Sequence, residues 1–257
     1  MTGVQTCALP IFYNLDCVAY ESVLLGLFTI WRGEDSHREK PNDVCVGFSR
    51  DGFHWDRGSR GVFIPVSDRV GDWNWANVQS AGGCCLVVGD RLHFYVSGRA
   101  GVPGTGDPGV CSTGLATLRR DGFASLEPPG PSDVVRHSPR VGPNTVVTRP
   151  VRFSGRYLFV NADVTGGTLR AQIEDVDGRP LAPFTFDASV PTTGNQLAGR
   201  VVWRETADLA RVADRPVRFR FELTGRLYAF WVSRSERGTS GGFVGAGGPG
   251  YRTMRDE

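Results

Sequence analysis

Two carboxylates near the beginning of the chain stand where acid–base chemistry would be placed. Asp16 and Glu21 lie in the segment 13–21, and an apolar run begins just after Glu21. A carboxyl group at such a position can donate or accept a proton, or bind a hydroxyl group. The alternative for Glu21 is an exposed carboxylate at the end of a strand, with no role in chemistry.

A second group of residues combines indole rings with amides. The segment Asp72-Trp73-Asn74-Trp75 is followed closely by Asn77 and Gln79. Indole faces stack on the C–H faces of sugars, and neighbouring amides bind hydroxyl groups. We therefore expect Trp73 and Trp75 to bind carbohydrate, with hydrogen bonds from Asn77 and Gln79. The alternative is that at least one of the two indoles packs between neighbouring sheets.

The strands that would position these residues belong to a unit that occurs twice. A strand-loop-strand unit runs over residues 24–53 and recurs over 91–123, and each copy ends in Arg-Asp-Gly-Phe, at positions 50–53 and 120–123, which is a spacing of 70. Self-similarity at this period, built from short strands, predicts a radial β array of the propeller type. Arg32 and Arg99 end corresponding strands of the two copies. They would bind hydroxyl or acidic groups, or be ordinary hairpin-end charges.

The composition predicts an all-β chain. With 34 Gly and 16 Pro among 257 residues, the sequence is divided into short segments. No stretch keeps a helical period, and apolar residues cluster or alternate instead. One short helical turn at residues 207–212 is the exception.

The second half of the chain has its own strand pattern. Residues 217–223 alternate apolar and charged side chains, as a strand with one buried face does, and residues 227–232 form a continuous apolar run. A tight turn is expected between them at Thr224-Gly225-Arg226, and another at Asp177-Gly178 after a strand over 168–175. Strands and turns at this spacing predict a β-sandwich of about a hundred residues.

Proline and glycine mark the expected domain boundaries. Residues 127–132 break regular structure, because Pro fixes φ and has no N–H to donate. We therefore expect a partial propeller over residues 12–135, a sandwich over 140–235 and a glycine-rich C-terminal tail over 236–257. No Lys-Ser/Thr follows the glycines of the tail, which argues against a phosphate-binding loop.

The first eleven residues resemble the translation of a short-read sequencing adapter. They contain neither a basic segment nor an apolar run long enough for a signal peptide. We interpret them as an artefact joined to a gene fragment, so that the native chain is expected to begin near Phe12 with its true N-terminus missing. The localisation of the protein is therefore left open.

Other classes of site lack their residue patterns. The cysteines after residue 11 are odd in number and show no Cys-x-x-Cys spacing, and the four histidines are scattered, so neither a disulfide framework nor a zinc site is expected. A net charge of +2 makes no case for nucleic acid, and no segment approaches the roughly 18 apolar residues of a membrane span. We expect no cofactor, and the oligomeric state stays open. Five cysteines follow residue 11, and most of them are expected to be buried core residues on strands. The five are Cys17, Cys45, Cys84, Cys85 and Cys111.

One segment carries a resemblance to a known group of proteins. Ser49-Arg50-Asp51-Gly52-Phe53-His54-Trp55 has the form Ser-x-Asp-Gly-x-x-Trp, a strand end that turns at Asp-Gly and is capped by Trp. It resembles the outer hairpins of five-bladed propeller glycosidases, the group that contains invertases, levanases, arabinanases and β-xylosidases. The second copy departs from this form, because its segment 120–126 ends in Leu and has no Trp. A β-sandwich after the propeller is also similar to the invertase-like members, and the likeness extends over most of residues 13–235.

The resemblance implies catalysis by carboxylates on the innermost strands of the first three blades. Acetal hydrolysis needs one carboxyl group to protonate the leaving oxygen and another to attack or to activate water. The two blades expected here would be the last two of five, with Glu21 and Asp16 facing the axis and most of the catalytic set in missing blades. The hallmark motifs Asn-Asp-Pro-Asn-Gly and Glu-Cys-Pro are absent from the sequence.

Two functions follow from this resemblance. In the first, the complete protein is a glycosidase, and this fragment of it is expected to be inactive. The second is a non-catalytic carbohydrate-binding or scaffold protein with the same fold. A third possibility is a lectin-like sandwich module that acts alone.

Overall fold

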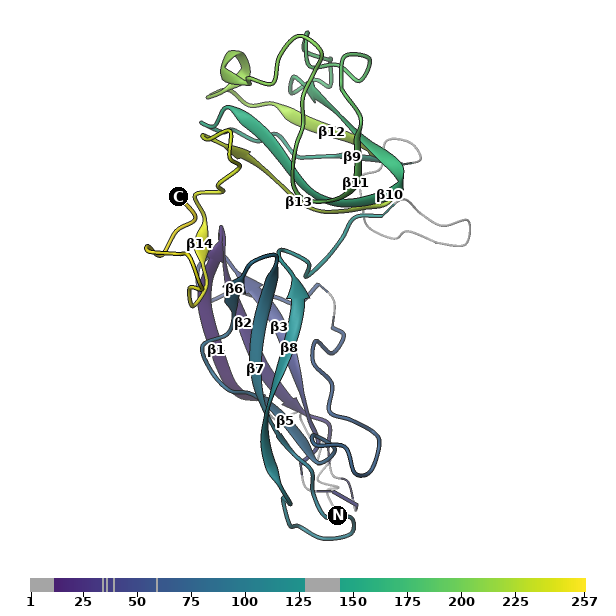
Figure 1. The fold of residues 1–257 in the computed structure, drawn as a ribbon, viewed down its shortest axis with the longest axis vertical. Coiled ribbons are helices and arrows are strands. Elements are labelled where there is room, and N and C mark those ends of the chain that lie inside the picture. The colour runs from purple at the N-terminus through teal and green to yellow at the C-terminus, as the bar shows by residue number, and fades with distance from the viewer. Residues whose placement is uncertain (1–11, 34, 36, 39, 59, 128–143) are drawn as a thin grey trace, which may run out of the picture. The chain divides into compact units, whose positions relative to one another are not determined.

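A computed structural model describes residues 12–33, 35, 37–38, 40–58, 60–127 and 144–257 (Figure 1). The adapter-like segment 1–11 lies outside the described residues. The described part is all-β, as predicted, with antiparallel sheets and a single 3₁₀ turn at Ala210–Val212. It divides into two compact units: the first comprises the described residues up to Leu118 together with Gly242–Asp256, and the second comprises Arg119–Gly241 with Glu257.

The first sheet of the first unit is an antiparallel meander with one added strand. Its order is β14-β1-β2-β3-β4, and every pair is antiparallel. Side chains of β2 and β3 are buried on both faces, which explains why both segments read as continuous apolar runs. The strands are β1 (Phe12–Glu21), β2 (Val23–Trp31), β3 (Asn42–Ser49), β4 (Trp55–Asp56) and β14 (Phe243–Val244).

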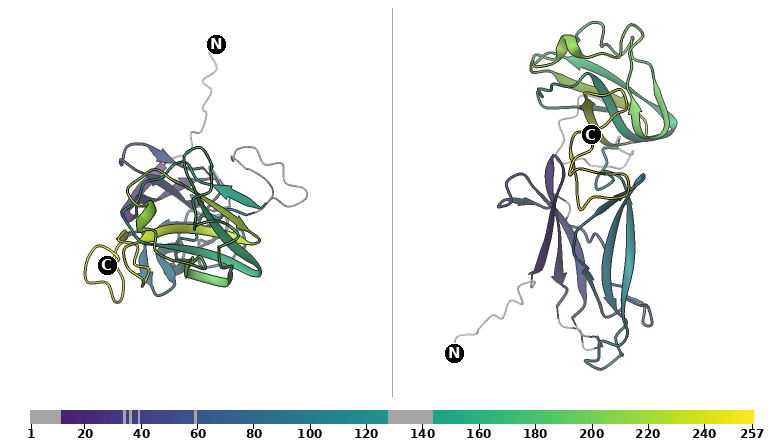
Figure 2. Two further views of the ribbon diagram at one scale, coloured as in Figure 1. Left: turned by 90° about the horizontal axis from the view of Figure 1, so that it is seen from above. Right: turned by 60° about the vertical axis from the view of Figure 1, so that its left-hand side comes forward.

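The second sheet of the first unit is built around β7 (Arg91–Arg99). On one side β7 pairs with β5 (Asn77–Ser80) and β6 (Leu86–Val88), and on the other with β8 (Cys111–Arg119). The side chains of β7 alternate, so that Leu92, Phe94 and Val96 are buried and their neighbours are more exposed. In Figure 2 the two sheets of this unit form separate layers.

The C-terminal glycine-rich segment is part of the first unit and not a separate tail. Strand β14 pairs with β1, the N–H of Ala246 donates to the carbonyl of Cys85 (2.9 Å), and the N–H of Val87 donates to that of Gly247 (2.8 Å). The segment therefore joins the edges of both sheets. Gly248 allows this close approach, because a Cβ there would clash with the carbonyl oxygen of Val87.

The second unit contains one described sheet, built around the long strand β10 (Tyr157–Glu174). Strand β11 (Thr192–Arg200) pairs with one side of β10. Strands β12 (Arg218–Leu223) and β13 (Arg226–Ser233) both pair with it in the antiparallel direction, and β9 (Thr145–Val147) extends the sheet beyond β12.

The tight turn predicted between β12 and β13 is wrong. The two strands do not pair with each other but follow one another along β10, where Leu223 lies opposite Leu169 and Arg226 opposite Asp163. The chain bends at Gly225, whose φ of +127° suits glycine. The bend replaces a hairpin because β10 supplies hydrogen-bond partners to both strands. The other predicted turn, at Asp177-Gly178, is confirmed: the N–H of Gly178 donates to the carbonyl of Asp175 (3.1 Å).

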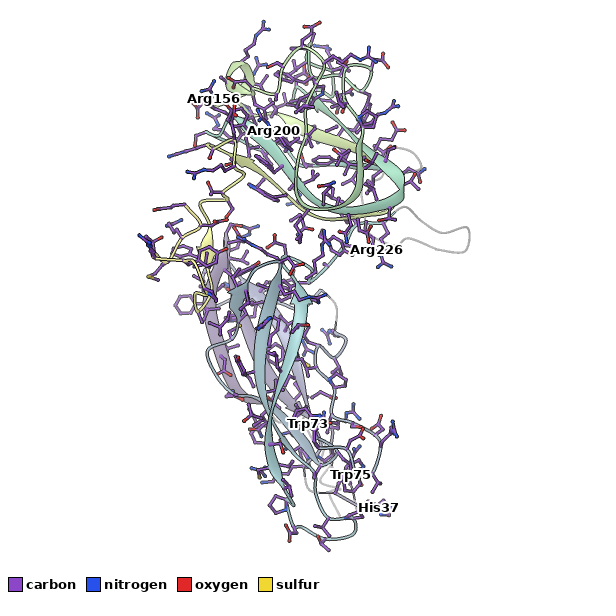
Figure 3. All side chains as sticks on the ribbon, in the orientation of Figure 1. His37, Trp73, Trp75, Arg156, Arg200 and Arg226 are labelled. Carbon is purple, nitrogen blue, oxygen red and sulfur yellow. The ribbon has the colours of Figure 1, made fainter. Side chains whose placement is uncertain are left out.

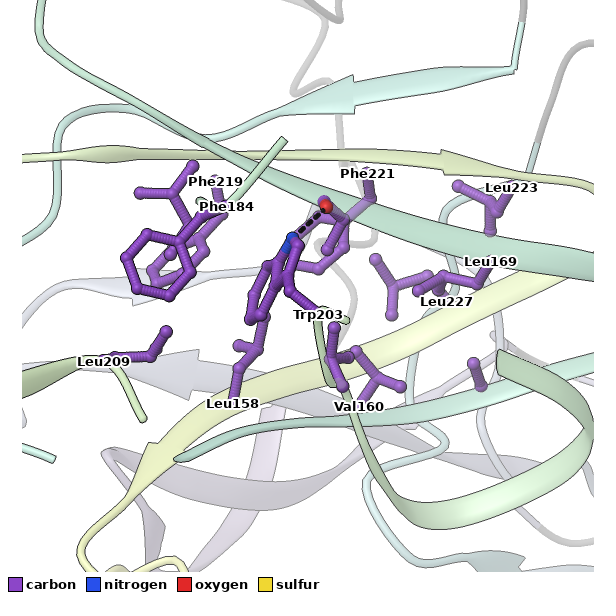
Figure 4. Packing of buried hydrophobic residues seen from close by; sticks show 14 of the residues in the cluster. Leu158, Val160, Leu169, Phe184, Trp203, Leu209, Phe219, Phe221, Leu223 and Leu227 are labelled. Carbon is purple, nitrogen blue, oxygen red and sulfur yellow. Dashed lines mark hydrogen bonds between the residues drawn. The ribbon is translucent and has the colours of Figure 1, made fainter. Parts of the chain in front are cut away.

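The core of the second unit lies between this sheet and the loops that cover it. Leu158 and Val160 from β10 pack with Phe184 and Trp203 from the connecting loops, and all four are buried (Figure 4). The indole N–H of Trp203 donates to the carbonyl of Ala171 on β10 (3.0 Å), which ties the loops to the sheet. The indole's one polar group is thereby satisfied within an otherwise apolar core.

Candidate functional site

Most of the predicted binding residues lie at one end of the first unit. Arg32 follows β2, Asn77 begins β5, and Asn77 pairs with Arg99 at the end of β7. Two hydrogen bonds show that the ends of the two sheets meet there: Asn77 Nδ2 donates to the carbonyl of Lys40 (2.8 Å), and Arg38 Nη1 donates to the carbonyl of Trp75 (2.9 Å). We call this region the loop end of the first unit.

The two indoles of the loop end have different environments. Trp75 is 4% exposed, and the guanidinium of Arg38 lies 5.6 Å from its ring centroid. Trp73 is 40% exposed. Trp75 therefore has a packing role, which is the alternative expected from the sequence for at least one of the two indoles. Trp73 keeps part of its ring accessible to a ligand. Figure 3 shows both indoles and His37 at this end.

The ring of Trp73 rests on two strand glycines. A Cβ at Gly98 of β7 or at Gly114 of β8 would clash with its six-membered ring. Glycine in the interior of a strand often marks such a close approach, because no side chain stands between the backbone and its neighbour. The side chain of the adjacent Asn74 is held by a hydrogen bond from Nδ2 to the carbonyl of Pro65 (3.2 Å). Both features fix the indole in position.

Arg32 belongs to a network of charges within the loop end. Its Nε and Nη2 donate to the two oxygens of Asp43 (2.6 and 2.9 Å), and its Nη1 donates to Asp68 (3.0 Å). The hydrogen bond to Asp43 raises the pKa of Arg32, and the hydrogen bond from Arg38 lowers the pKa of Asp68. Because carboxylates already pair with its guanidinium, Arg32 is better suited to holding the loops than to binding an acidic ligand.

The remaining polar candidates serve the backbone or lie within a strand. Asn77 is buried, and its bond to Lys40 supports a residue with the left-handed φ of +46°. Gln79 is half-buried within β5 and lies opposite Ser97. Arg99 is half-buried, and its carbonyl accepts from the N–H of Ala76 (2.9 Å). Among the predicted binding residues, Trp73 is the one with a large exposed surface.

The two predicted carboxylates do not form a pair. Asp16 lies opposite Leu27 in the middle of β1, and Glu21 is its last residue, with a φ of +49°. Residues five positions apart on a strand point to opposite faces, and their Cα atoms are separated by about 16 Å. Glycosidase carboxyl groups lie within about 5–10 Å of each other. Glu21 also lies at the opposite end of the first sheet from Arg32, about 30 Å away along β2.

The described cysteines are free thiols. Cys45, Cys84 and Cys85 are buried, in agreement with the expected core role, whereas Cys17 and Cys111 are exposed. The hydrogen bond with Cys85 and burial raise the pKa of Cys84, so its sulfur is a neutral thiol. No cluster of His, Cys, Asp and Glu within the described ranges could hold a metal ion.

The residues that sequence reasoning missed are those that support the indoles. Arg38, Asp43 and Asp68 form the charge network, and Gly98 and Gly114 carry Trp73. The two strand glycines were the available signal, because an interior glycine indicates a close neighbour. Nothing in the sequence indicated which neighbour it was.

No protein-family model, curated protein or solved structure matches this chain. In the part of the chain that the structure describes, no helix has the length and apolar character needed to cross a membrane. The geometry of the loop end is therefore the basis for a functional proposal.

Proposed function

We propose that this chain binds carbohydrate through the exposed indole of Trp73, as part of a glycoside hydrolase-like propeller protein. One observation carries the proposal: Trp73 is 40% exposed while two strand glycines fix its ring from below. A rigid, accessible indole is the surface on which the C–H face of a sugar stacks, and it loses little conformational freedom on binding.

A repeated arrangement supports the propeller part of this proposal. In the first sheet the indole of Trp55 rests on Gly26 and Gly47, which lie directly opposite each other on β2 and β3. In the second sheet Trp73 rests on Gly98 and Gly114 in the same manner. Two antiparallel meanders, each with an indole over strand glycines, are consistent with two neighbouring blades of a radial array. The second unit would then be the β-sandwich of the invertase-like members.

We infer that the chain by itself does not hydrolyse glycosides. Asp16 and Glu21 are too far apart on β1 to act as acid and nucleophile on one bond. A glycosidase of this type would need its catalytic carboxylates on other blades, whereas a carbohydrate-binding or scaffold protein would need none. Both alternatives share binding at Trp73.

The test is an isothermal calorimetric titration of the purified chain with arabino-, xylo- and fructo-oligosaccharides. The variant Trp73→Ala should weaken binding at least about tenfold, which corresponds to about 1.4 kcal/mol. The matched control is Trp55→Ala, which removes the other glycine-supported indole and should leave the affinity unchanged. Circular dichroism checks that both variants are folded.

Two results would contradict the proposal. Equal affinity of the wild type and Trp73→Ala would remove the indole from the site. Release of reducing sugar by the wild-type chain at an ordinary enzymatic rate would show that it carries a complete catalytic set.

A further inference from the structure

The outer edge of β8 has no partner strand among the described residues. Strand β8 pairs with β7 on one side, and no other described strand continues the sheet beyond it. Outside that pairing, the described backbone hydrogen bonds near this strand are those of Val110 and Arg119 at its two ends. An edge of this kind offers a row of N–H and C=O groups to another strand.

The equivalent edge of the first sheet is covered. Strand β4 pairs with Phe48 and Ser49 of β3. Farther along β3, the N–H of Val44 donates to the carbonyl of Ile64 (3.0 Å), and the N–H of Ile64 donates back (2.9 Å). Among the residues that the structure describes, the two sheets therefore differ at the same place: the edge of β3 is covered, and the edge of β8 is not.

Apart from Arg119 at its end, the sequence of β8 lacks the charged residues and prolines that keep an edge from pairing. Residues 111–118 contain no charged side chain and no Pro, which are the usual protective residues at sheet edges. Their more exposed side chains alternate as Cys111, Thr113, Leu115 and Thr117, and Leu115 is 50% exposed. The segment 113–117 is symmetrical about Leu115, because a threonine stands two residues away on either side.

We propose that β8 pairs with β8 of a second copy of this chain, antiparallel and with a twofold axis at Leu115. This register places Leu115 opposite Leu115 and Thr113 opposite Thr117, both favourable cross-strand pairs. Arg119 falls opposite Cys111 of the second copy, so no like charges face each other. The contact is self-complementary and closed, which makes the assembly a homodimer.

The first experiment measures the mass of the full chain in solution by light scattering after size exclusion. One copy has a mass of 28.0 kDa, and we expect twice that mass at micromolar concentration. The variant Leu115→Lys places two ammonium groups at the axis and should weaken the dimer at least about tenfold. The control Val176→Lys adds the same charge at a 45% exposed position in the second unit, outside the sheet of β8, and should leave the dimer intact.

A second experiment fixes the register by oxidative cross-linking. In a background of Cys17→Ser and Cys111→Ser, Leu115→Cys should form a disulfide-linked dimer, because residue 115 faces its own copy. Thr113→Cys should cross-link less, because it faces Thr117. A monomer at about 100 μM, far above ordinary dimer dissociation constants, would overturn the proposal. A dimer insensitive to Leu115→Lys, or stronger cross-linking at 113 than at 115, would overturn it as well.

Discussion

The two Arg-Asp-Gly-Phe segments share four residues but have different structures. In the first, the carboxylate of Asp51 accepts hydrogen bonds from the N–H groups of Phe53 and His54 (2.9 and 2.8 Å), and the chain returns to β3 as β4. In the second, Asp121 has a φ of +58°, and the chain goes on to pair Leu126 with Leu227 of the second unit. After the first turn the chain pairs with the sheet it came from, and after the second turn it does not.

The residues that flank each motif account for this difference. Before the first, the hydroxyl of Ser49 accepts from the N–H of Gly52 (2.9 Å) and supports the turn. Arg119 stands at the equivalent position of the second, where its guanidinium donates to Asn161 (2.7 Å) and to the carbonyl of Gln196 (2.8 Å). The Arg-Asp-Gly-Phe motif therefore predicts a turn, but the residue before it, Ser49 or Arg119, determines whether the chain returns to the same sheet.

The two sheets also depend differently on the C-terminal segment, and its removal should have the largest effect. Deletion of residues 242–257 removes β14 from the edge of β1, together with the buried Val244 and the hydrogen bonds to Cys85 and Val87. We expect the free energy of unfolding of the first unit to fall by about 4 kcal/mol. Amide hydrogen exchange measures each unit separately and should show the second unchanged.

A pair of glycine substitutions is the matched control for that deletion. Gly248→Ala should reproduce part of the loss, because its Cβ would clash with the backbone of Val87. Gly106→Ala meets no atom within 4 Å and should be neutral. Equal protection of the first unit with and without the segment would mean that the sheets hold together without this connection.

The role of Arg119 provides the second test of the comparison. Arg119→Ala removes the bonds to Asn161 and Gln196 and the contact with the ring of Tyr228, whose centroid lies 4.8 Å from the guanidinium carbon. We expect the second unit to lose about 2 kcal/mol, because the buried amide of Asn161 is left without a donor.

Chemical denaturation followed by hydrogen exchange measures this loss. The control is Arg179→Ala in the same unit, whose exposed pair with Asp177 spans 3.8 Å and should contribute less than about 0.5 kcal/mol. If both substitutions cost the same, Arg119 does not organise the second turn.

Local patterns in the sequence predicted strands better than they predicted strand partners. The predicted strand with alternating side chains over residues 217–223 coincides with β12, because burial of every second side chain leaves a regular pattern in the sequence. Thr224-Gly225-Arg226 predicted a tight turn, because turn residues are local signals. The strand that pairs with both flanking segments, β10, lies some fifty residues earlier in the chain. Turn chemistry alone does not specify which strand pairs with which.

The candidate site shows the same limit. The indoles of Trp73 and Trp75 were identified by their type, but their exposure depends on groups contributed by distant segments. Gly98 and Gly114 support the first, and Arg38 covers the second. The pair Asp16 and Glu21 was suggested by proximity in sequence, yet the pleat of a strand directs such residues to opposite faces.

The smallest expected effect is a pH dependence at the first turn. Hydrogen bonds from the N–H of His54, from its ring and from the N–H of Phe53 hold the pKa of Asp51 well below its ordinary value. Because the folded-state pKa is the lower one, the unfolded chain takes up the proton first as the pH falls. The stabilisation is therefore complete above the unfolded pKa of about 3.9 and is lost as the pH falls toward the folded value.

Asp51→Asn should lower the Tm at pH 7 but approach the wild type below about pH 4. The control is Ser80→Ala, which removes a hydroxyl that accepts from the N–H of Gly82 (3.3 Å) in another turn of the first unit. This hydroxyl does not contact Asp51 and does not titrate, so the difference between this variant and the wild type should stay constant over this range. A constant difference for Asp51→Asn as well would show that the charge of Asp51 does not stabilise this turn, and the contrast between the two motifs would then rest on Ser49 and Arg119 alone.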